Sequence, residues 1–252
     1  MHQKHEPMNL PLPATASHSV LDQARAAWSL LAGADASFLP GSTSIVVAPA
    51  SRLSPPGWMA VVVLGDAALV TVPTARMADR ATTALRDLGT QELADPDRLH
   101  DRLRINEVLG PAHLLFLTPS RFRPVPSVAE RVPGDDPLLL ALLDRCGPAD
   151  ADESALADIT SSARVLRRDG QIAAAAGHEL WPRGTAHLSI LTDPRHRRRG
   201  LALDVASAAV ADALSQGLLC QWRGRTLASR RVAQTLGFQE TGFQLSLRLS
   251  EN

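Results

Sequence analysis

The stretch that decides the fold is LTDPRHRRRGLALDVASAAVADAL, residues 191–214. Four arginines occupy the five positions from Arg195 to Arg199, and Gly200 then opens a long run of Ala, Leu and Val. The preceding segment TAHLSILT, residues 185–192, has the short apolar pattern of a buried strand. The sequence therefore predicts a strand, a basic loop and a helix over residues 200–215, in that order.

The basic loop suits one compact anion. The first N–H groups of a helix have no partner within the helix, and the helix dipole places partial positive charge beside them. A glycine at that point lets a phosphate approach the backbone, and arginine side chains add charge-assisted hydrogen bonds. Because residues 201–214 carry no basic residue, the pattern favours a pyrophosphate over a nucleic acid lying along a helix face.

The composition excludes several classes of protein. The chain of 252 residues is 45% hydrophobic and 21% charged, and its formal net charge is zero, so no overall field attracts nucleic acid or a membrane surface. The two cysteines lack metal-binding spacing and suit a reducing compartment. With no secretory or membrane-spanning apolar run, we expect a cytoplasmic protein. The eight histidines show no HxH or HExxH spacing, so no metal is expected.

The first half of the chain has the pattern of a small α/β domain. Residues 1–16 are polar and punctuated by proline, which predicts a flexible tail. Between residues 17 and 125 the expected elements are a helix, a strand, a hairpin turning at Gly65-Asp66, two helices and a buried strand. They cover residues 18–33, 42–50, 59–73, 75–89, 95–110 and 112–119.

A proline-rich segment separates this half from the next. Residues 121–137 contain four prolines in 17 positions, which predicts a domain boundary between residues 125 and 126. Residues 126–252 then show a helix, a polar stretch that could form a second helix, a hairpin turning at Asp169-Gly170, and the strand and helix described above. A strand, a helix and one or two closing strands follow. These expected elements cover residues 137–147, 149–159, 162–180, 185–192, 200–215, 219–225, 227–237 and 238–249.

Two motifs resemble those of the GCN5-related N-acetyltransferase (GNAT) family. The hexapeptide Arg197-Arg198-Arg199-Gly200-Leu201-Ala202 fits the family's Q/R-x-x-G-x-G/A loop, and ASRRVAQTLGF, residues 228–238, resembles its helix ending in Leu-Gly-Phe. Together with the order of elements, the resemblance covers residues 135–249. It implies an α/β fold whose mixed, largely antiparallel central sheet is flanked by helices.

A narrower resemblance concerns GLLCQW, residues 217–222, followed by that helix. The pair is similar to the zwittermicin-resistance-like acetyltransferase branch, whose members carry an extra N-terminal half. Residues 17–125 could then be a degenerate copy of the same fold, a lid on the acceptor pocket or a homodimer surface, and the sequence does not choose among these.

The resemblance implies acetyl-CoA as co-substrate and assigns the residues that bind it. The backbone of Ile190, Leu191 and Thr192 would pair with the pantetheine arm in a splay between two parallel strands. The loop from Arg197 through Arg198, Arg199, Gly200, Leu201 and Ala202 to Leu203 would hold the pyrophosphate. A small-molecule or peptide-like amine would attack the thioester directly in a ternary complex.

The catalytic residues are less certain from the pattern. His187, on the strand before the loop, titrates near neutrality and is the first candidate for a base, with a histidine packed on the sheet as the alternative. Glu179 is the second candidate, the alternative being a solvated carboxylate. Asp152 and Glu153 could attract a cationic amine or lie in an exposed acidic loop.

The clearest departure from the family is a missing tyrosine. Many members carry one five residues before the Phe of Leu-Gly-Phe, where this chain has Ala233, and the chain contains no tyrosine at all. Protonation of the CoA thiolate would fall to water or to another group, and Ser229, one turn earlier, is our candidate. The sequence thus favours an acetyl-CoA-dependent N-acetyltransferase, with a catalytically weakened acyl-CoA-binding sensor or scaffold as the alternative.

Overall fold

The N-terminal segment (residues 17–125) and the C-terminal segment (residues 126–252) contribute strands to the same sheet. The computed structural model describes residues 19–250, so the expected tail at residues 1–16 lies outside the described part. The ten strands follow the order β1-β3-β2-β10-β4-β9-β8-β7-β6-β5. Their bounds are β1 Thr43–Val47, β2 Met59–Leu64, β3 Ala67–Val72, β4 Ile105–Leu117, β5 Glu130–Val132, β6 Ala163–Arg168, β7 Gln171–Trp181, β8 Thr185–Thr192, β9 Leu219–Gly224 and β10 Gln239–Leu249.

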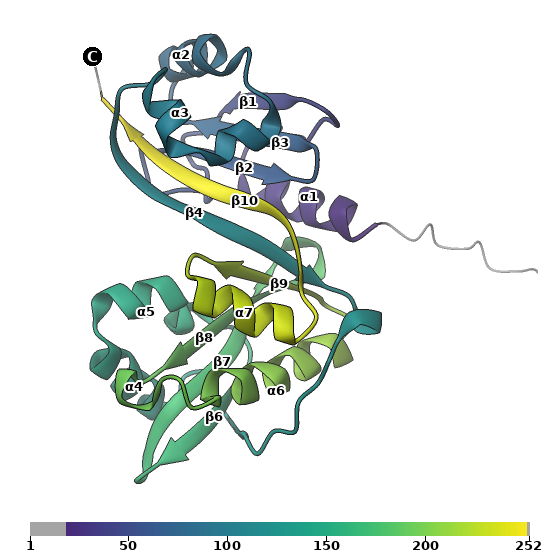
Figure 1. Ribbon diagram of the computed structural model, residues 1–252, viewed down its shortest axis with the longest axis vertical. Helices are drawn as coiled ribbons and strands as arrows, with labels where there is room; N and C mark the ends of the chain where they lie inside the picture. Colours follow the sequence, from purple (N-terminus) through teal and green to yellow (C-terminus); the bar gives the residue numbers. More distant parts are fainter. Residues whose placement is uncertain (1–18, 251–252) are drawn as a thin grey trace, which may run out of the picture.

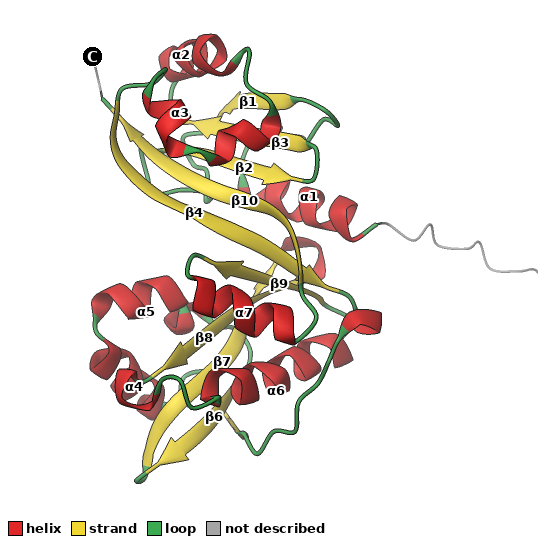
Figure 2. Cartoon of the chain, in the orientation of Figure 1, coloured by secondary structure: helices red, strands yellow, loops and turns green. Residues whose placement is uncertain are grey.

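The sheet is mixed and largely antiparallel, which confirms the predicted fold class. Only β1 with β3 and β8 with β9 pair in parallel in the part of the chain that the structure describes. Helices cover both faces of the sheet (Figure 2). They are α1 Val20–Leu31, α2 Ala75–Leu85, α3 Pro96–His100, α4 Pro137–Cys146, α5 Pro148–Ser154, α6 Leu201–Ser215 and α7 Leu227–Thr235.

Every helix except α5, which has no buried residue, places an apolar side in one of four clusters. Helices α6 and α7 pack on β6 to β9, and α4 packs on the opposite face of β5 to β8. In the N-terminal segment, α2 and α3 cover one face of β2, β3 and β10, whereas α1 covers the other face through residues such as Trp28. Local capping agrees with these bounds, since the Thr74 and Thr226 side chains accept hydrogen bonds from N–H groups in the first turns of α2 and α7.

The last strand crosses the predicted boundary between the two segments. Strand β10 lies between β2 and β4 and is antiparallel to both, as Figure 1 shows for the yellow strand beside teal β4. It carries Phe243, Leu245 and Leu247 into the core of the N-terminal segment. Strand β4 in turn pairs with β9 through His113–Leu117. The segments therefore share backbone ladders, and the domain boundary between residues 125 and 126 stays a prediction.

The prediction of a helix over residues 95–110 is wrong after residue 100. Helix α3 ends at His100, and β4 begins at Ile105 and continues to Leu117. Residues 105–109 pair with β10, which lies more than a hundred residues further along the chain. Local periodicity cannot register such a partner, and strand pairing overrides it.

Two further expectations need correction. No element was predicted between residues 119 and 137, but the edge strand β5 lies there, and its residues Glu130–Val132 pair with β6. The second helix over residues 149–159 ends at Ser154, and a short 3-10 turn follows at Leu156–Asp158. The other helices, the two hairpins and the remaining strands lie where the sequence predicts them, within a few residues.

Candidate functional site

A gap opens between the two parallel strands β8 and β9. They pair only from Thr185–His187 to residues 219–221, so the rest of β8 has no partner on that side. A cavity of about 270 Å³, which we call the splay cavity, lies beside this gap. Its lining comes from α5, β8, the loop after β8, β9 and the start of α7: Asp150, Glu153, Ser154, Leu188, Ile190, Leu191, Thr192, Arg197, Trp222, Arg223, Thr226, Ala228 and Ser229.

The start of α6 presents free backbone donors beside this cavity. Gly200 is the residue before the helix and has φ +79°, and a Cβ added there would meet nothing within 4 Å. The backbone N–H groups of residues 198–202 have no hydrogen-bond partner in the described part of the chain. Beyond them the helix is anchored by Val205 and Val210, which are fully buried. The loop is thus held at one end by packing and leaves its N–H groups available to an anion.

A buried carboxylate holds the loop between β8 and α6. Asp193 is 1% exposed and accepts hydrogen bonds from Arg195 Nη2 at 2.8 Å and from Arg145 Nε at 3.0 Å. The Arg195 guanidinium holds the pKa of this carboxyl well below its usual range, although burial opposes that shift. Arg145 also donates to the carbonyl of Ile172 at 2.6 Å, so the loop is tied to both α4 and β7.

The four arginines of this loop fall into two groups. Arg195 binds Asp193, and Arg197 pairs with Asp150 at 2.5 Å and donates to the Thr192 carbonyl at 3.2 Å. Arg198 and Arg199 are exposed and make no ion pair with any residue that the structure describes. Two arginines therefore shape the loop, and two remain available to a ligand.

His187 lies in a packed environment. It is 5% exposed, its Nδ1 is 2.5 Å from Gln221 Oε1, and its ring stacks on Trp181 with centroids 4.1 Å apart. Burial lowers its pKa to about 3, so the imidazole is neutral near pH 7. His187 does not line the splay cavity. This position favours the packed histidine over the predicted base.

Glu179 lies next to His187 in the sheet, and it too is outside the cavity lining. Its carboxylate accepts a hydrogen bond from Trp181 Nε1 at 2.8 Å and pairs with Arg52 at 3.2 Å. These contacts join the N-terminal segment to β7 and do not favour a catalytic role.

Ser229 is the one predicted catalytic residue that lines the splay cavity. Its Oγ accepts a hydrogen bond from Trp222 Nε1 at 3.0 Å, which leaves the hydroxyl proton free to be donated. Ala233, one turn further along α7, is fully buried in the core against α6. Packing thus replaces the missing tyrosine, and Ser229 is the hydroxyl of α7 that lines the splay cavity.

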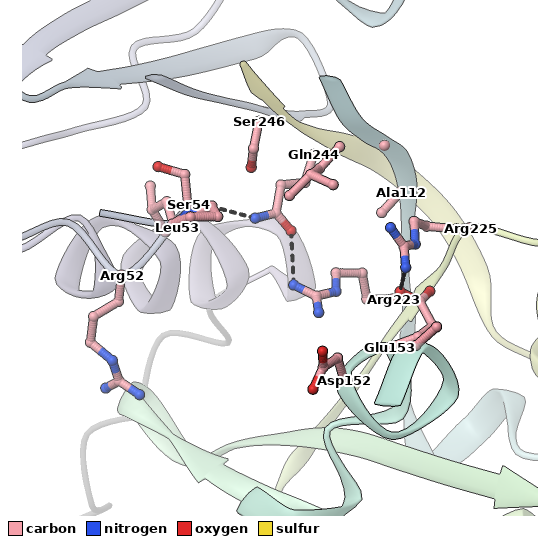
Figure 3. Close-up of a pocket in the computed structure, with 14 residues that line it drawn as sticks. Arg52, Leu53, Ser54, Ala112, Asp152, Glu153, Arg223, Arg225, Gln244 and Ser246 are labelled. Atoms are coloured by element: carbon pink, nitrogen blue, oxygen red, sulfur yellow. Dashed lines mark hydrogen bonds and ion pairs between the residues drawn. The ribbon is translucent and has the colours of Figure 1, made fainter. Parts of the chain in front are cut away.

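A second cavity of about 500 Å³, the inter-segment cavity, lies between the N-terminal segment and α5 (Figure 3). The loop at residues 52–55, β4 and β10 form one wall, and α5 and the end of β9 form the other. Glu153 and Arg223 line both cavities, so the two spaces adjoin at these side chains. Neither His187 nor Glu179 lines this second cavity.

Sequence reasoning missed Arg223. It described Asp152 and Glu153 as acids that could attract a cationic amine or lie in an exposed loop, and both line the inter-segment cavity. A signal for Arg223 was present, because a charged residue follows Gln221 and Trp222 inside a strand of buried residues. Charged side chains inside such strands are seldom placed there without a partner or a function.

The family comparison matches the region that builds the splay cavity. Residues 164–243, from β6 into β10, match the model described as GNAT acetyltransferase. These residues are similar to the GNAT acetyltransferase family. They contain both the splay and the loop that opens α6.

Three solved structures illustrate how far the likeness extends. A GNAT-family acetyltransferase from Novosphingobium aromaticivorans is 23% identical, with 57% of this chain and 66% of that chain covered and a TM-score of 0.43. A GCN5-related N-acetyltransferase from Kribbella flavida is 19% identical, with 64% and 66% covered and a TM-score of 0.46. A GCN5-related N-acetyltransferase-like protein from Streptococcus suis is 14% identical, with 93% and 94% covered and a TM-score of 0.43.

The first two matches span just under two thirds of those relatives' length. Because the TM-scores are all below 0.5, the likeness to the family depends on the matched residues 164–243. No curated protein matches the chain significantly. Among residues 19–250, no helix is long and apolar enough to cross a membrane, and no three His, Cys, Asp or Glu side chains are grouped to hold a metal ion.

Proposed function

We propose that the protein is an acetyl-CoA-dependent N-acetyltransferase that acts on an amine of a small-molecule or peptide-like acceptor. The observation that carries the proposal is the junction of two cavities at Glu153 and Arg223, with the free N–H groups of the α6 loop beside one of them. Such an arrangement can hold a donor and an acceptor at the same time, as direct transfer requires.

The donor fits the splay cavity by its chemistry. The pantetheine arm is an extended chain with amide groups, and the unpaired edge of β8 at Ile190, Leu191 and Thr192 offers backbone partners to such a chain. The pyrophosphate would lie on the N–H groups of the loop over residues 197–203, where Gly200 leaves room for it. Arg198 and Arg199 would contact its oxygens from the solvent side.

The reaction needs two proton movements. The acceptor nitrogen loses a proton and forms a bond to the acyl carbon, the carbon–sulfur bond breaks, and the CoA thiolate takes up a proton. Glu153, which lines both cavities, would accept the first proton directly or through water. Ser229, which lines the splay cavity and accepts from Trp222, would donate a hydrogen bond to the sulfur.

The narrower relationship to the zwittermicin-resistance-like branch is part of this proposal. It is supported by the Gly217-Leu218 and Trp222 pattern before α7 and by the presence of an N-terminal segment. The acceptor of such a protein does not follow from these residues.

An acyl-CoA-binding module without turnover is the second candidate. Two observations favour it, namely the alanine at position 233 and the enclosure of His187. Measuring free CoA released from acetyl-CoA in the presence of amines separates the two candidates, because a binding module releases none above the amine-free background.

Calorimetric titration with acetyl-CoA tests the proposed function. Gly200→Asp places a negative charge beside the expected pyrophosphate, and Gly200→Asn is its matched neutral control. Both side chains tolerate a positive φ, and the space around Gly200 is open, so both variants should fold. We expect Gly200→Asp to weaken binding by about tenfold or more and Gly200→Asn by much less. Equal affinities in all three proteins would refute the pyrophosphate site.

A further inference from the structure

The inter-segment cavity carries two charged groups that lack an opposite partner. The Arg223 guanidinium enters it from β9, and the Asp152 carboxylate enters it from α5, as Figure 3 shows. Neither forms an ion pair with any residue between 19 and 250. A cation and an anion that stay apart inside one cavity could each be satisfied by a ligand that carries both charges.

Arg223 is the more constrained of the two. The side chain is half-buried, and its one protein partner is the amide oxygen of Gln244, at 3.3 Å from Nη1. Burial lowers the pKa of this guanidinium, and the nearby Glu153 carboxylate opposes that shift without pairing. The planar guanidinium fork matches a carboxylate or phosphate through two parallel hydrogen bonds, and the remaining donors of Arg223 are available for one.

The shape of the cavity depends on Gln244. This β10 side chain accepts from Arg223 and donates through Nε2 to the carbonyl of Leu53 at 2.5 Å. One amide thus joins the C-terminal strand, the loop at residues 52–55 and the β9 arginine. The guanidinium is therefore held in place before any ligand arrives, which reduces the entropy lost on binding.

The acidic side of the cavity is formed by α5. Glu153 pairs with Arg225, whereas Asp152 is exposed and without a partner among the described residues. A cationic amine would be attracted to this side. Glu153 also lines the splay cavity, so an amine held here lies where the two substrates would meet.

We propose that the inter-segment cavity is the acceptor site and that it selects amines which also carry a carboxylate, such as free amino acids or short peptide-like acids. The ammonium lies toward Asp152 and Glu153, and the carboxylate binds Arg223. This inference depends on the proposed function, because it assigns the acceptor of that reaction. It gives the N-terminal segment a role, since the loop at residues 52–55 and β4 complete the wall of the site.

The test compares the common amino acids with the corresponding amino acid amides, which keep the amine and lose the carboxylate. Acetyl-CoA affinity is measured first by calorimetry, and CoA release then gives kcat and KM for each amine. In the unaltered protein we expect kcat/KM for the acids to exceed that for the amides by about tenfold or more.

Two variants dissect the site. Arg223→Gln should raise KM for the acids by about tenfold and leave KM for the amides nearly unchanged. Asp152→Asn should raise KM for acids and amides alike, because both carry the amine. Arg86→Gln, an exposed arginine on the far side of the N-terminal segment, is the matched control and should change neither. Calorimetry on each variant separates a loss of acceptor binding from a loss of acetyl-CoA binding.

Several outcomes would overturn the inference. If the amides react with the same kcat/KM as the acids, the site does not recognise the carboxylate. If Arg223→Gln lowers kcat/KM equally for acids and amides, that side chain has a structural role. If acetyl-CoA binds but no acid in the panel reacts, the acceptor assignment fails alone. If acetyl-CoA does not bind, the proposed function itself fails.

Discussion

Leu245 tests whether the two segments unfold as one unit. It lies in the middle of β10, is fully buried, and packs among strands and helices of the N-terminal segment. Replacement by alanine removes Cγ and both Cδ atoms from a dense core, and Leu→Ala changes at such sites cost about 2–5 kcal/mol. Because total stability is about 5–15 kcal/mol, the loss should be a large fraction of the free energy of unfolding.

The structure predicts where that loss appears. Strand β10 pairs with β2 on one side and β4 on the other, and β4 pairs with β9 of the C-terminal segment. Leu245→Ala should therefore lower the urea midpoint by about 1 M, taking about 3 kcal/mol and a slope of about 3 kcal/mol per molar. Unfolding followed by tryptophan fluorescence should remain a single transition.

Hydrogen exchange supplies the decisive comparison. In Leu245→Ala, amide exchange should increase in the β6–β7 hairpin as well as in the β2–β3 hairpin, since the shared sheet unfolds together. Leu227→Ala is the control, because that α7 side chain is 57% exposed and its loss should cost less than about 0.5 kcal/mol. Faster exchange confined to the β2–β3 hairpin, with two separate urea transitions, would refute the coupling.

Three other predictions follow from single side chains. Burial lowers the pKa of His187 from 6.5 to about 3. Between these pH values the unfolded chain binds a proton that the folded chain excludes. The stability present above pH 6.5 therefore declines as the pH falls. His187→Gln should reduce this pH dependence in urea titrations and leave the pH profile of CoA release near neutrality unchanged; a lost titration step in that profile would restore His187 as a base. Ser229→Ala should keep acetyl-CoA affinity within about threefold and lower kcat by about tenfold, and an unchanged kcat would assign thiolate protonation to water. Burial raises the pKa of Cys146 to about 11 and of Cys220 to about 12, so a thiol reagent should label the native chain slowly near neutral pH, whereas rapid labelling would contradict their burial.

The local patterns in the sequence predicted most elements of the C-terminal segment. Strand β8, Gly200 and helix α6 depend on short-range periodicity and on a glycine with positive φ, and all lie where expected. The loop residues proposed to bind acetyl-CoA could therefore be named from the chain alone. Ser229 was reachable too, because helical spacing relates it to Ala233.

The base could not be chosen in the same way. A histidine on a strand has two faces available to it, and only the packed structure places His187 against Trp181 and Gln221. Likewise Asp152 and Glu153 are ordinary exposed acids in the sequence. They become part of a cavity because α5 lies opposite the loop at residues 52–55 and Arg223.

The sequence by itself therefore determined the strand, loop and helix over residues 185–215, since these depend on neighbours within a few residues. Only the tertiary structure decided that residues 105–109 form a strand and that the two segments share one sheet. Strand β4 extends to Ile105 because β10, formed by the last residues described, supplies its hydrogen bonds. The same long-range pairing brings Gln244 to Leu53 and Arg223, and no local pattern records a contact that closes a loop of nearly two hundred residues.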